Sequence, residues 1–121
     1  MKKILVVDDQ KIILKLVNMT LSDGNYECVE ALSGQEALDI LDQVRPDLIV
    51  LDIMMPGGIS GYDVCKAVKT TDELSDIPVL MLSAKSQQKD IEEGLSVGAD
   101  EYITKPFSPE KLTAKINKLI T

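Results

Sequence analysis

PDLIVLDIMMP, at residues 46–56, encloses a short apolar run that ends at an aspartate. The run Leu48–Leu51 is too short for a helix, and its unbroken apolarity is typical of a parallel strand buried on both faces. Four other stretches are expected to be strands. Two are continuous apolar runs, Ile4–Val7 and Val79–Leu82. Polar and apolar residues alternate in Tyr26–Glu30, as in an edge strand, and Tyr102–Thr104 is a brief fifth candidate.

Segments with the period of a helix separate these runs. In the first two segments the apolar residues that share a face are Ile13, Leu16, Val17 and Leu21, then Ala37, Leu38, Leu41 and Val44. Further helices are expected around Val64–Val68 and Ile91–Val97, and a last one is expected to bury Leu112, Ile116 and Leu119. The regular alternation predicts an α/β fold, a doubly wound five-stranded parallel sheet with helices on both faces.

Polar residues mark the starts of several helices. Ser108 is suited to cap the last helix, with Pro109 at its first position. Ser33 with Glu36, and Ser60 with Asp63, have the spacing of a capping box.

Composition excludes several kinds of chemistry. The 121 residues are enough for one domain of roughly ordinary size. With 13 basic and 20 acidic residues the net charge is −7, and the chain has no histidine and a single arginine, Arg45. Without histidine there is no Ser-His-Asp or Cys-His pair and no His-ligated zinc. An acidic chain also lacks the cationic surface that binds nucleic acid.

Cysteine usage and hydropathy indicate a cytoplasmic protein. Cys28 and Cys65 are too few for a disulfide framework or a Cys-rich zinc site, and we expect both to be free thiols. The apolar run after Met1 stops at Asp8, short of the roughly seven to fifteen residues of a signal peptide. No other apolar run approaches the roughly twenty residues of a membrane span, so no membrane association is expected.

Polar side chains follow four of the five predicted strands. Asp8 and Asp9 follow the first, Asp52 the third, Ser83 the fourth and Lys105 the fifth. In the strand order 2-1-3-4-5 these positions meet at the carboxyl edge of the sheet, where open α/β sheets place their ligands. The sequence therefore predicts that three carboxylates, a hydroxyl and an ammonium group converge.

This convergence has an electrostatic cost that indicates what the site binds. Two carboxylates about 5 Å apart repel by roughly 3 kcal/mol at an effective dielectric of about 20. Lys105 offsets one charge, and oxygen ligands without His or Cys suit Mg²⁺ or Mn²⁺, and Ca²⁺ less well. Each residue alone has a plainer explanation: Asp9 is expected in addition to cap the first helix, Ser83 could be a cap, and Lys105 a surface lysine.

Several motifs together resemble the receiver domain of response regulators in bacterial two-component phosphorelays. The resemblance covers essentially the whole chain, 1–121, as one receiver domain. It is carried by the segments Ile4–Asp9, Pro46–Pro56 and Leu82–Ala84, by Gly61, and by Gly98–Asp100 and Tyr102–Phe107. It implies a flavodoxin-like (βα)5 fold of strand order 2-1-3-4-5, Mg²⁺ dependence and phosphorylation of one aspartate.

The resemblance implies a role for each matching residue. Asp52 corresponds to the phosphoryl acceptor and a metal ligand, Asp9 to a direct ligand, and Asp8 to one acting through water. The main-chain carbonyl of Met54 corresponds to the third protein ligand. Three further residues correspond to catalytic or switching positions. Lys105 corresponds to the lysine that contacts the phosphoryl group, and its peptide bond to Pro106 is cis in this family. Ser83 corresponds to the catalytic and switch hydroxyl, and Tyr102 to the switch aromatic ring.

The implied function is signal transduction by phosphoryl transfer from a histidine kinase phosphohistidine to Asp52. The protein is then expected to be no enzyme, since it catalyses only its own phosphorylation and dephosphorylation. The expected partners are a sensor histidine kinase or phosphotransfer protein, and a downstream protein or output domain. A phosphorylation-dependent homodimer is a further expectation. The signalling surface comprises the fourth helix, fifth strand and fifth helix, with candidate contacts Lys111, Lys115, Asp90 and Glu93.

Two departures and three alternatives accompany this interpretation. The loop after Asp52 is one residue longer than the commonest form, and Met54 and Lys85 stand at family-variable positions linked to phosphoryl lifetime. Apolar Met54 favours a longer-lived phosphoprotein. A haloacid-dehalogenase-type phosphatase requires a second acid where Met54 stands, and a flavodoxin requires a first loop that binds phosphate, which Asp8 and Asp9 would repel. A receiver that has lost phosphorylation is the third alternative, which metal titration would distinguish.

Overall fold

Strands and helices alternate along the whole chain. The computed structural model describes residues 1–22, 24–55, 57–85 and 87–120. Within these ranges the strands are β1 (Lys2–Val7), β2 (Tyr26–Ala31), β3 (Leu48–Leu51), β4 (Val79–Ser83) and β5 (Glu101–Thr104). The helices are α1 (Lys11–Leu21), α2 (Gly34–Leu41), α3 (Gly61–Thr70), α4 (Gln88–Ser96) and α5 (Pro109–Ile120).

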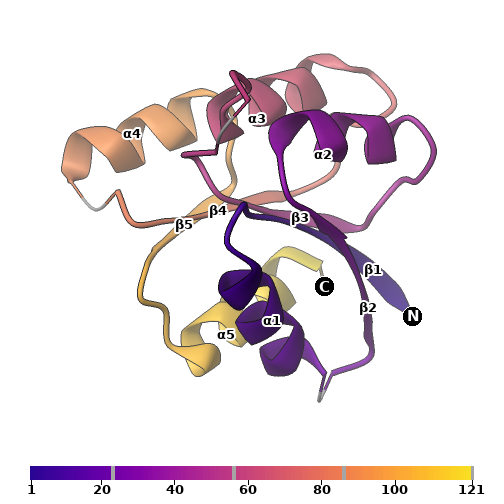
Figure 1. Cartoon of the computed structure of the whole chain (residues 1–121), viewed down its shortest axis with the longest axis vertical. Coiled ribbons are helices and arrows are strands. Elements are labelled where there is room, and N and C mark those ends of the chain that lie inside the picture. The colour runs from indigo at the N-terminus through magenta and orange to yellow at the C-terminus, as the bar shows by residue number, and fades with distance from the viewer. Residues whose placement is uncertain (23, 56, 86, 121) are drawn as a thin grey trace.

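The strands form one parallel sheet in the order β2-β1-β3-β4-β5, which confirms the predicted topology. Figure 1 shows α1 and α5 on one face of the sheet and α2, α3 and α4 on the other. The order reverses between β1 and β3, and this reversal opens a crevice beyond their carboxyl ends.

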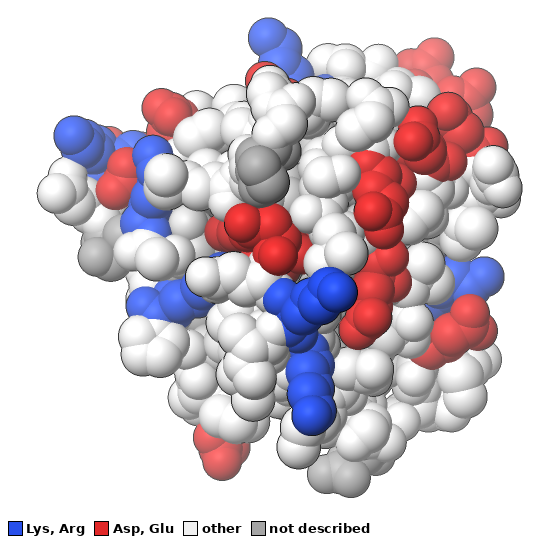
Figure 2. All heavy atoms as spheres, in the orientation of Figure 1, with Lys and Arg blue, Asp and Glu red and all other residues white. Residues whose placement is uncertain are grey.

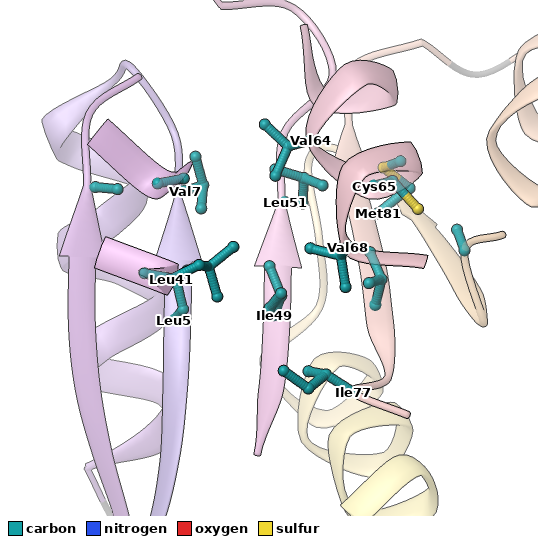
Figure 3. Close-up of a cluster of buried hydrophobic side chains, with 14 of the residues drawn as sticks. Leu5, Val7, Leu41, Ile49, Leu51, Val64, Cys65, Val68, Ile77 and Met81 are labelled. Atoms are coloured by element: carbon teal, nitrogen blue, oxygen red, sulfur yellow. The ribbon is translucent and has the colours of Figure 1, made fainter. Parts of the chain in front are cut away.

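The core has two halves separated by the sheet. Every residue of β3 is buried, and alternate side chains enter opposite halves, because successive residues of a strand point to opposite faces. Ile49 and Leu51 pack with Val64 and Val68 of α3, as Figure 3 shows. Leu48 and Val50 join the half beneath α1 and α5. Burying a side chain of this size stabilises the fold by about 1.5–3 kcal/mol, so these short strands contribute strongly.

The predicted faces of three helices need correction. On α1, Leu14, Val17 and Leu21 are buried, whereas Leu16 is 42% exposed and Ile13 half-buried. The buried stripe is therefore rotated toward Leu14. In addition, α2 ends at Leu41, so Val44 lies beyond the predicted helix, and in α5 Leu119 is only half-buried.

Three of the predicted helix caps are present in the structure, and one is not. Ser60 and Asp63 form the predicted capping box, and Ser33 accepts a bond from the backbone N–H of Glu36. The Ser108 hydroxyl accepts from the backbone N–H of Lys111, as expected of an N-cap. Asp9 does not cap α1: β1 ends at Val7, the helix begins only at Lys11, and its N-cap is Gln10. Every helix in the described ranges is too short or too polar to cross a bilayer.

Candidate functional site

The sheet itself brings the predicted site residues together. The backbone N–H of Asp8 donates to Ala31 (3.1 Å), that of Asp52 to Val7 (2.9 Å), and that of Lys105 to Ser83 (2.8 Å). Each bond extends the pairing of neighbouring strands by one residue, so the residue just past a strand is held as firmly as the strand. The predicted convergence is confirmed for the three carboxylates and Lys105, whereas Ser83 is the last residue of β4 and not the residue after it.

Three carboxylates lie together beyond β1 and β3. Oxygens of Asp8, Asp9 and Asp52 lie within 4.8 Å of one another. Asp8 and Asp52 are buried, whereas Asp9 is exposed. Figure 2 shows acidic side chains grouped near the middle of this face, with basic side chains close by. Three oxygen donors, one of them open to solvent, could hold a hard divalent cation, and such an ion would offset their repulsion.

Lys105 supplies the positive charge within the site. Its Nζ lies 2.7 Å from Asp8 Oδ2 and 3.6 Å from Asp52 Oδ1. The lysine side chain is only 12% exposed, so its charge is weakly screened by water. Lys105 therefore bridges two of the three carboxylates, and the peptide bond to Pro106 is cis, as the resemblance implied.

Burial and neighbouring charge shift the acidity of Asp52. Burial raises its pKa to about 6, and the negative charge of Asp8 adds to this rise. Lys105 and the backbone N–H of Ile53, which donates to Asp52 Oδ1 at 2.8 Å, act in the opposite direction. The ionised carboxylate is thus costly in this environment, and any added positive charge would stabilise it.

Ser83 and Tyr102 meet at the loop that follows β4. The buried Ser83 hydroxyl accepts from the backbone N–H of Lys85 at 3.2 Å. The Tyr102 hydroxyl donates to the Lys85 carbonyl at 2.7 Å. Tyr102 is half-buried rather than exposed, and burial raises the pKa of its phenol. The two predicted switch residues therefore hold the two main-chain groups of one loop residue.

An open groove of about 470 Å³ lies beside the carboxylates, with Met54 and Lys85 among its lining residues. Met54 is 66% exposed. Lys85 Nζ lies 3.9 Å from Asp90 Oδ1 on α4 and 6.0 Å from the centroid of the Tyr62 ring. The two family-variable positions thus line the same groove, together with Asp9 of the carboxylate group.

Gly61, the first residue of α3, permits a close backbone approach. Its N–H donates to the Ile53 carbonyl at 2.8 Å. A Cβ at position 61 would collide with the Asp52 carbonyl and lie 2.8 Å from Ile53 Cα. In the longer loop, Gly57 and Gly58 have φ angles of +97° and +84°, a backbone conformation that glycine adopts without steric cost. Pro56 lies outside the described residues.

Sequence reasoning missed two features beside the site, the role of the Lys85 main chain and the position of Gly94. The main chain of Lys85 is the shared partner of Ser83 and Tyr102, and no side-chain pattern reveals a main-chain partner. Gly94 lies buried within α4 against the Tyr102 ring. A glycine inside a helix is a detectable signal, because it lowers helix propensity and calls for a packing reason.

Comparison with known proteins agrees with this fold and site. Residues 4–117 match the response regulator receiver domain. The phosphate regulon transcriptional regulatory protein PhoB of Pseudomonas aeruginosa is 42% identical over 98% of this chain and 52% of its own length. The alkaline phosphatase synthesis transcriptional regulatory protein PhoP of Bacillus subtilis is 42% identical over 98% of this chain and 48% of its length. The structure of the chemotaxis response regulator CheY4 of Vibrio cholerae superposes with a TM-score of 0.91 at 36% identity, covering 98% of each chain.

The fold, the carboxylate site and these matches together define a phosphoryl-accepting domain of two-component signal transduction. The chain belongs to the response regulator receiver domain family. It spans about half the length of the curated relatives it matches.

Proposed function

We propose that Asp52 is the residue that accepts the phosphoryl group, from the phosphohistidine of a sensor histidine kinase or phosphotransfer protein. The observation that carries this proposal is the arrangement around Asp52: it is buried at the end of β3, with Lys105 Nζ at 3.6 Å and the Asp8 and Asp9 carboxylates beside it. Of the three carboxylates, Asp8 is already paired with Lys105 at 2.7 Å and Asp9 is exposed to solvent. Asp52 is therefore the carboxylate that Lys105 and the other two aspartates surround.

The proposed transfer is a displacement at phosphorus. An oxygen of the ionised Asp52 attacks, the bond between phosphorus and the donor nitrogen breaks, and its electron pair remains on the donor imidazole. The N–H of Ile53 holds Oδ1, which fixes the carboxylate plane and leaves Oδ2 to attack. The product is an acyl phosphate on Asp52. Later attack by water at phosphorus breaks the bond between phosphorus and the Asp52 oxygen, which releases inorganic phosphate and restores the carboxylate.

The residues fit a divalent cation, which we propose to be Mg²⁺, with Mn²⁺ as a substitute. Asp9 and Asp52 would bind it directly, Asp8 through a water, and Met54 through its main-chain carbonyl. When bound, the ion neutralises charge on the transferring phosphoryl oxygens. Lys105 Nζ, 3.6 Å from Asp52 Oδ1, would contact the same oxygens, and the two positive groups together would compensate the negative charge of the phosphoryl group on Asp52.

The proposed reaction makes the domain a signalling module rather than an enzyme with a separate substrate. It promotes only its own phosphorylation and dephosphorylation. Ser83 would donate to a phosphoryl oxygen, a charge-assisted bond that competes with its contact to the Lys85 loop. Tyr102 would respond through the same loop, which leads into α4.

We place the signalling surface on α4, β5 and α5. Of its four candidate contacts, Lys111 and Glu93 are exposed. Lys115 pairs with Glu101 at 2.6 Å and Asp90 with Lys85 at 3.9 Å, so using either would rearrange an existing ion pair. A downstream protein, an output domain or a second copy of the domain would bind here. PhoB and PhoP are named transcriptional regulators, so a transcriptional output is the proposed end of the pathway, with DNA contacted by another domain.

Labelling with acetyl phosphate and Mg²⁺ tests the acceptor. Intact-mass and peptide mass spectrometry should find one phosphoryl group, on Asp52, and none in Asp52→Asn. Asp47→Asn is the matched control, because Asp47 directly precedes β3 whereas Asp52 directly follows it. The Asp47→Asn protein should still be labelled. A label retained by Asp52→Asn would refute the assignment.

A further inference from the structure

Gly94 is a buried glycine in the second turn of α4, and it faces the ring of Tyr102. A Cβ at position 94 would lie 3.1 Å from both Cδ2 and Cε2 of that ring, and 3.7 Å from Cγ of Met81. Carbon atoms in ordinary contact are about 3.5–4.0 Å apart, so the ring occupies space that a methyl group needs. Glycine weakens a helix, and this close approach is a packing reason for its presence.

The inward position of the Tyr102 ring carries a hydrogen bond. Its hydroxyl donates to the Lys85 carbonyl at 2.7 Å, while the Lys85 N–H donates to the Ser83 hydroxyl at 3.2 Å. Both main-chain groups of Lys85 are therefore held, one by each predicted switch residue. The hydroxyl makes its bond to Lys85 while the ring lies against Gly94 of α4.

We infer that Gly94 is the positioning residue for Tyr102: the missing side chain at position 94 admits the ring beneath α4 and so sets how firmly Tyr102 holds the loop after β4. With a methyl group at position 94 the ring has little free space on the core side, because Met81, its neighbour on β4, is fully buried and its Cγ lies 3.7 Å from the position of that methyl group. Its low-cost escape is toward solvent, since Tyr102 is only half-buried. That movement breaks the bond to Lys85. The consequence for signalling, a changed balance between two Tyr102 positions, rests on the proposed function.

The test is NMR of the whole chain with labelled tyrosine rings, first without a phosphoryl donor. In the wild type, the Tyr102 ring protons should show NOEs to the α protons of Gly94 and the side chain of Met81. In Gly94→Ala, the ratio of inward to outward ring positions should fall at least about fivefold, as overpacking of this size implies, and the Met81 NOEs should weaken accordingly. Glu92→Ala, at an exposed position of the same helix, should leave them unchanged.

A stability cycle separates positioning from a general effect on α4. Alanine is the better helix former, so Gly94→Ala should raise the thermal midpoint when introduced into Tyr102→Ala, where the ring is gone. In the wild type the same change should give no such rise. Unchanged ring NOEs in Gly94→Ala, or an equal rise in both backgrounds, would overturn the inference. Neither measurement uses phosphorylation, so failure to label Asp52 would refute the proposed function and leave this result standing.

Discussion

Asp52 carries its charge at a cost that its neighbours only partly offset. It is 6% exposed and close to Asp8 and Asp9, and Lys105 is shared with Asp8 at the shorter distance. This competition explains why the pKa of Asp52 is raised despite a lysine at 3.6 Å. A carboxylate in this condition gains from any incoming positive charge.

Replacing Asp52 with Asn should stabilise the folded protein in a chelator. The raised pKa means that the folded state binds a proton at Asp52 more tightly than the unfolded chain, so stability is lost as pH rises through about 6. Asn removes that loss. We expect a gain of about 1–2 kcal/mol at pH 7.5, below what the full shift implies, because nearby solvent screens the charge.

Urea unfolding of both proteins at pH 7.5 and pH 4 checks this. Most of the gain should be lost at pH 4, where the folded form is protonated at Asp52 and the unfolded chain is close to half protonated there. An Asp52→Asn protein that is less stable at pH 7.5, or equally stabilised at both pH values, would contradict the electrostatic account.

Lys105→Arg should slow phosphorylation even though the charge is kept. The lysine side chain is 12% exposed and reaches two carboxylates with one compact ammonium, whereas a planar guanidinium is larger and directs its donors as a fork. Loss of a correctly placed donor slows such reactions by about 10²-fold. The labelling rate with acetyl phosphate measures this, and Lys111→Arg, an exposed lysine on α5, is the control. An equal rate in Lys105→Arg would argue against its proposed contact.

At the level of elements, the loops after the strands set the precision of the site. The loop from β3 to α3 returns so closely that Gly61 contacts the backbone of Asp52 and Ile53. The helix start is then fixed independently by the Ser60–Asp63 capping box. A rigid helix start pressed against the acceptor backbone positions Asp52 without a side-chain contact.

Gly61→Ala should therefore damage both stability and phosphorylation. The added methyl group meets backbone atoms, which cannot rotate away as a side chain can, and overpacking of this kind costs about 1–3 kcal/mol. Denaturant unfolding gives the loss of stability, and acetyl phosphate labelling gives the accompanying loss of rate. Lys66→Ala, exposed on α3, controls for changes to the helix itself. Wild-type values for both properties would show that the loop can yield.

The sequence predicts the elements better than it predicts their contacts. The strands at Leu48–Leu51 and Val79–Leu82 could be predicted from the sequence because a strand buried on both faces is apolar at every position. The α1 face was misassigned at Leu16, because with many apolar residues on one helix only the position of its neighbours decides which are covered. Likewise, Asp52 and Lys105 are predictable from their place after a strand. The Gly94–Tyr102 contact depends on how closely α4 approaches β5, which no local pattern encodes.

At the level of the whole molecule, the net charge is −7, and three of the carboxylates lie close together at one edge of the sheet. Cation binding at that edge should therefore stabilise the entire fold, because the ion binds a geometry that exists only when β1 and β3 are paired. The stabilisation reports on the site without requiring a phosphoryl donor.

Mg²⁺ at about ten times its dissociation constant should stabilise the protein by about 1.4 kcal/mol, or roughly 5 °C in thermal midpoint. Calorimetry at constant ionic strength measures this. Asp9→Asn should abolish most of the effect, whereas Asp39→Asn, an exposed acid of α2, should retain it. Equal stabilisation of the wild type and Asp9→Asn would show that Mg²⁺ acts by general screening instead.

The sheet order also leaves two strands, β2 and β5, at open edges. An unpaired edge is a template on which another chain can add a strand and begin to aggregate. On β2, Glu27 and Glu30 are exposed, so two such edges brought together would oppose like charges. The other edge is four residues long, and its Glu101 is bound by Lys115 and Lys118 of α5. The protein should therefore resist fibril growth through either edge, and charge-neutral substitutions at Glu27 and Glu30 are where that resistance would first weaken.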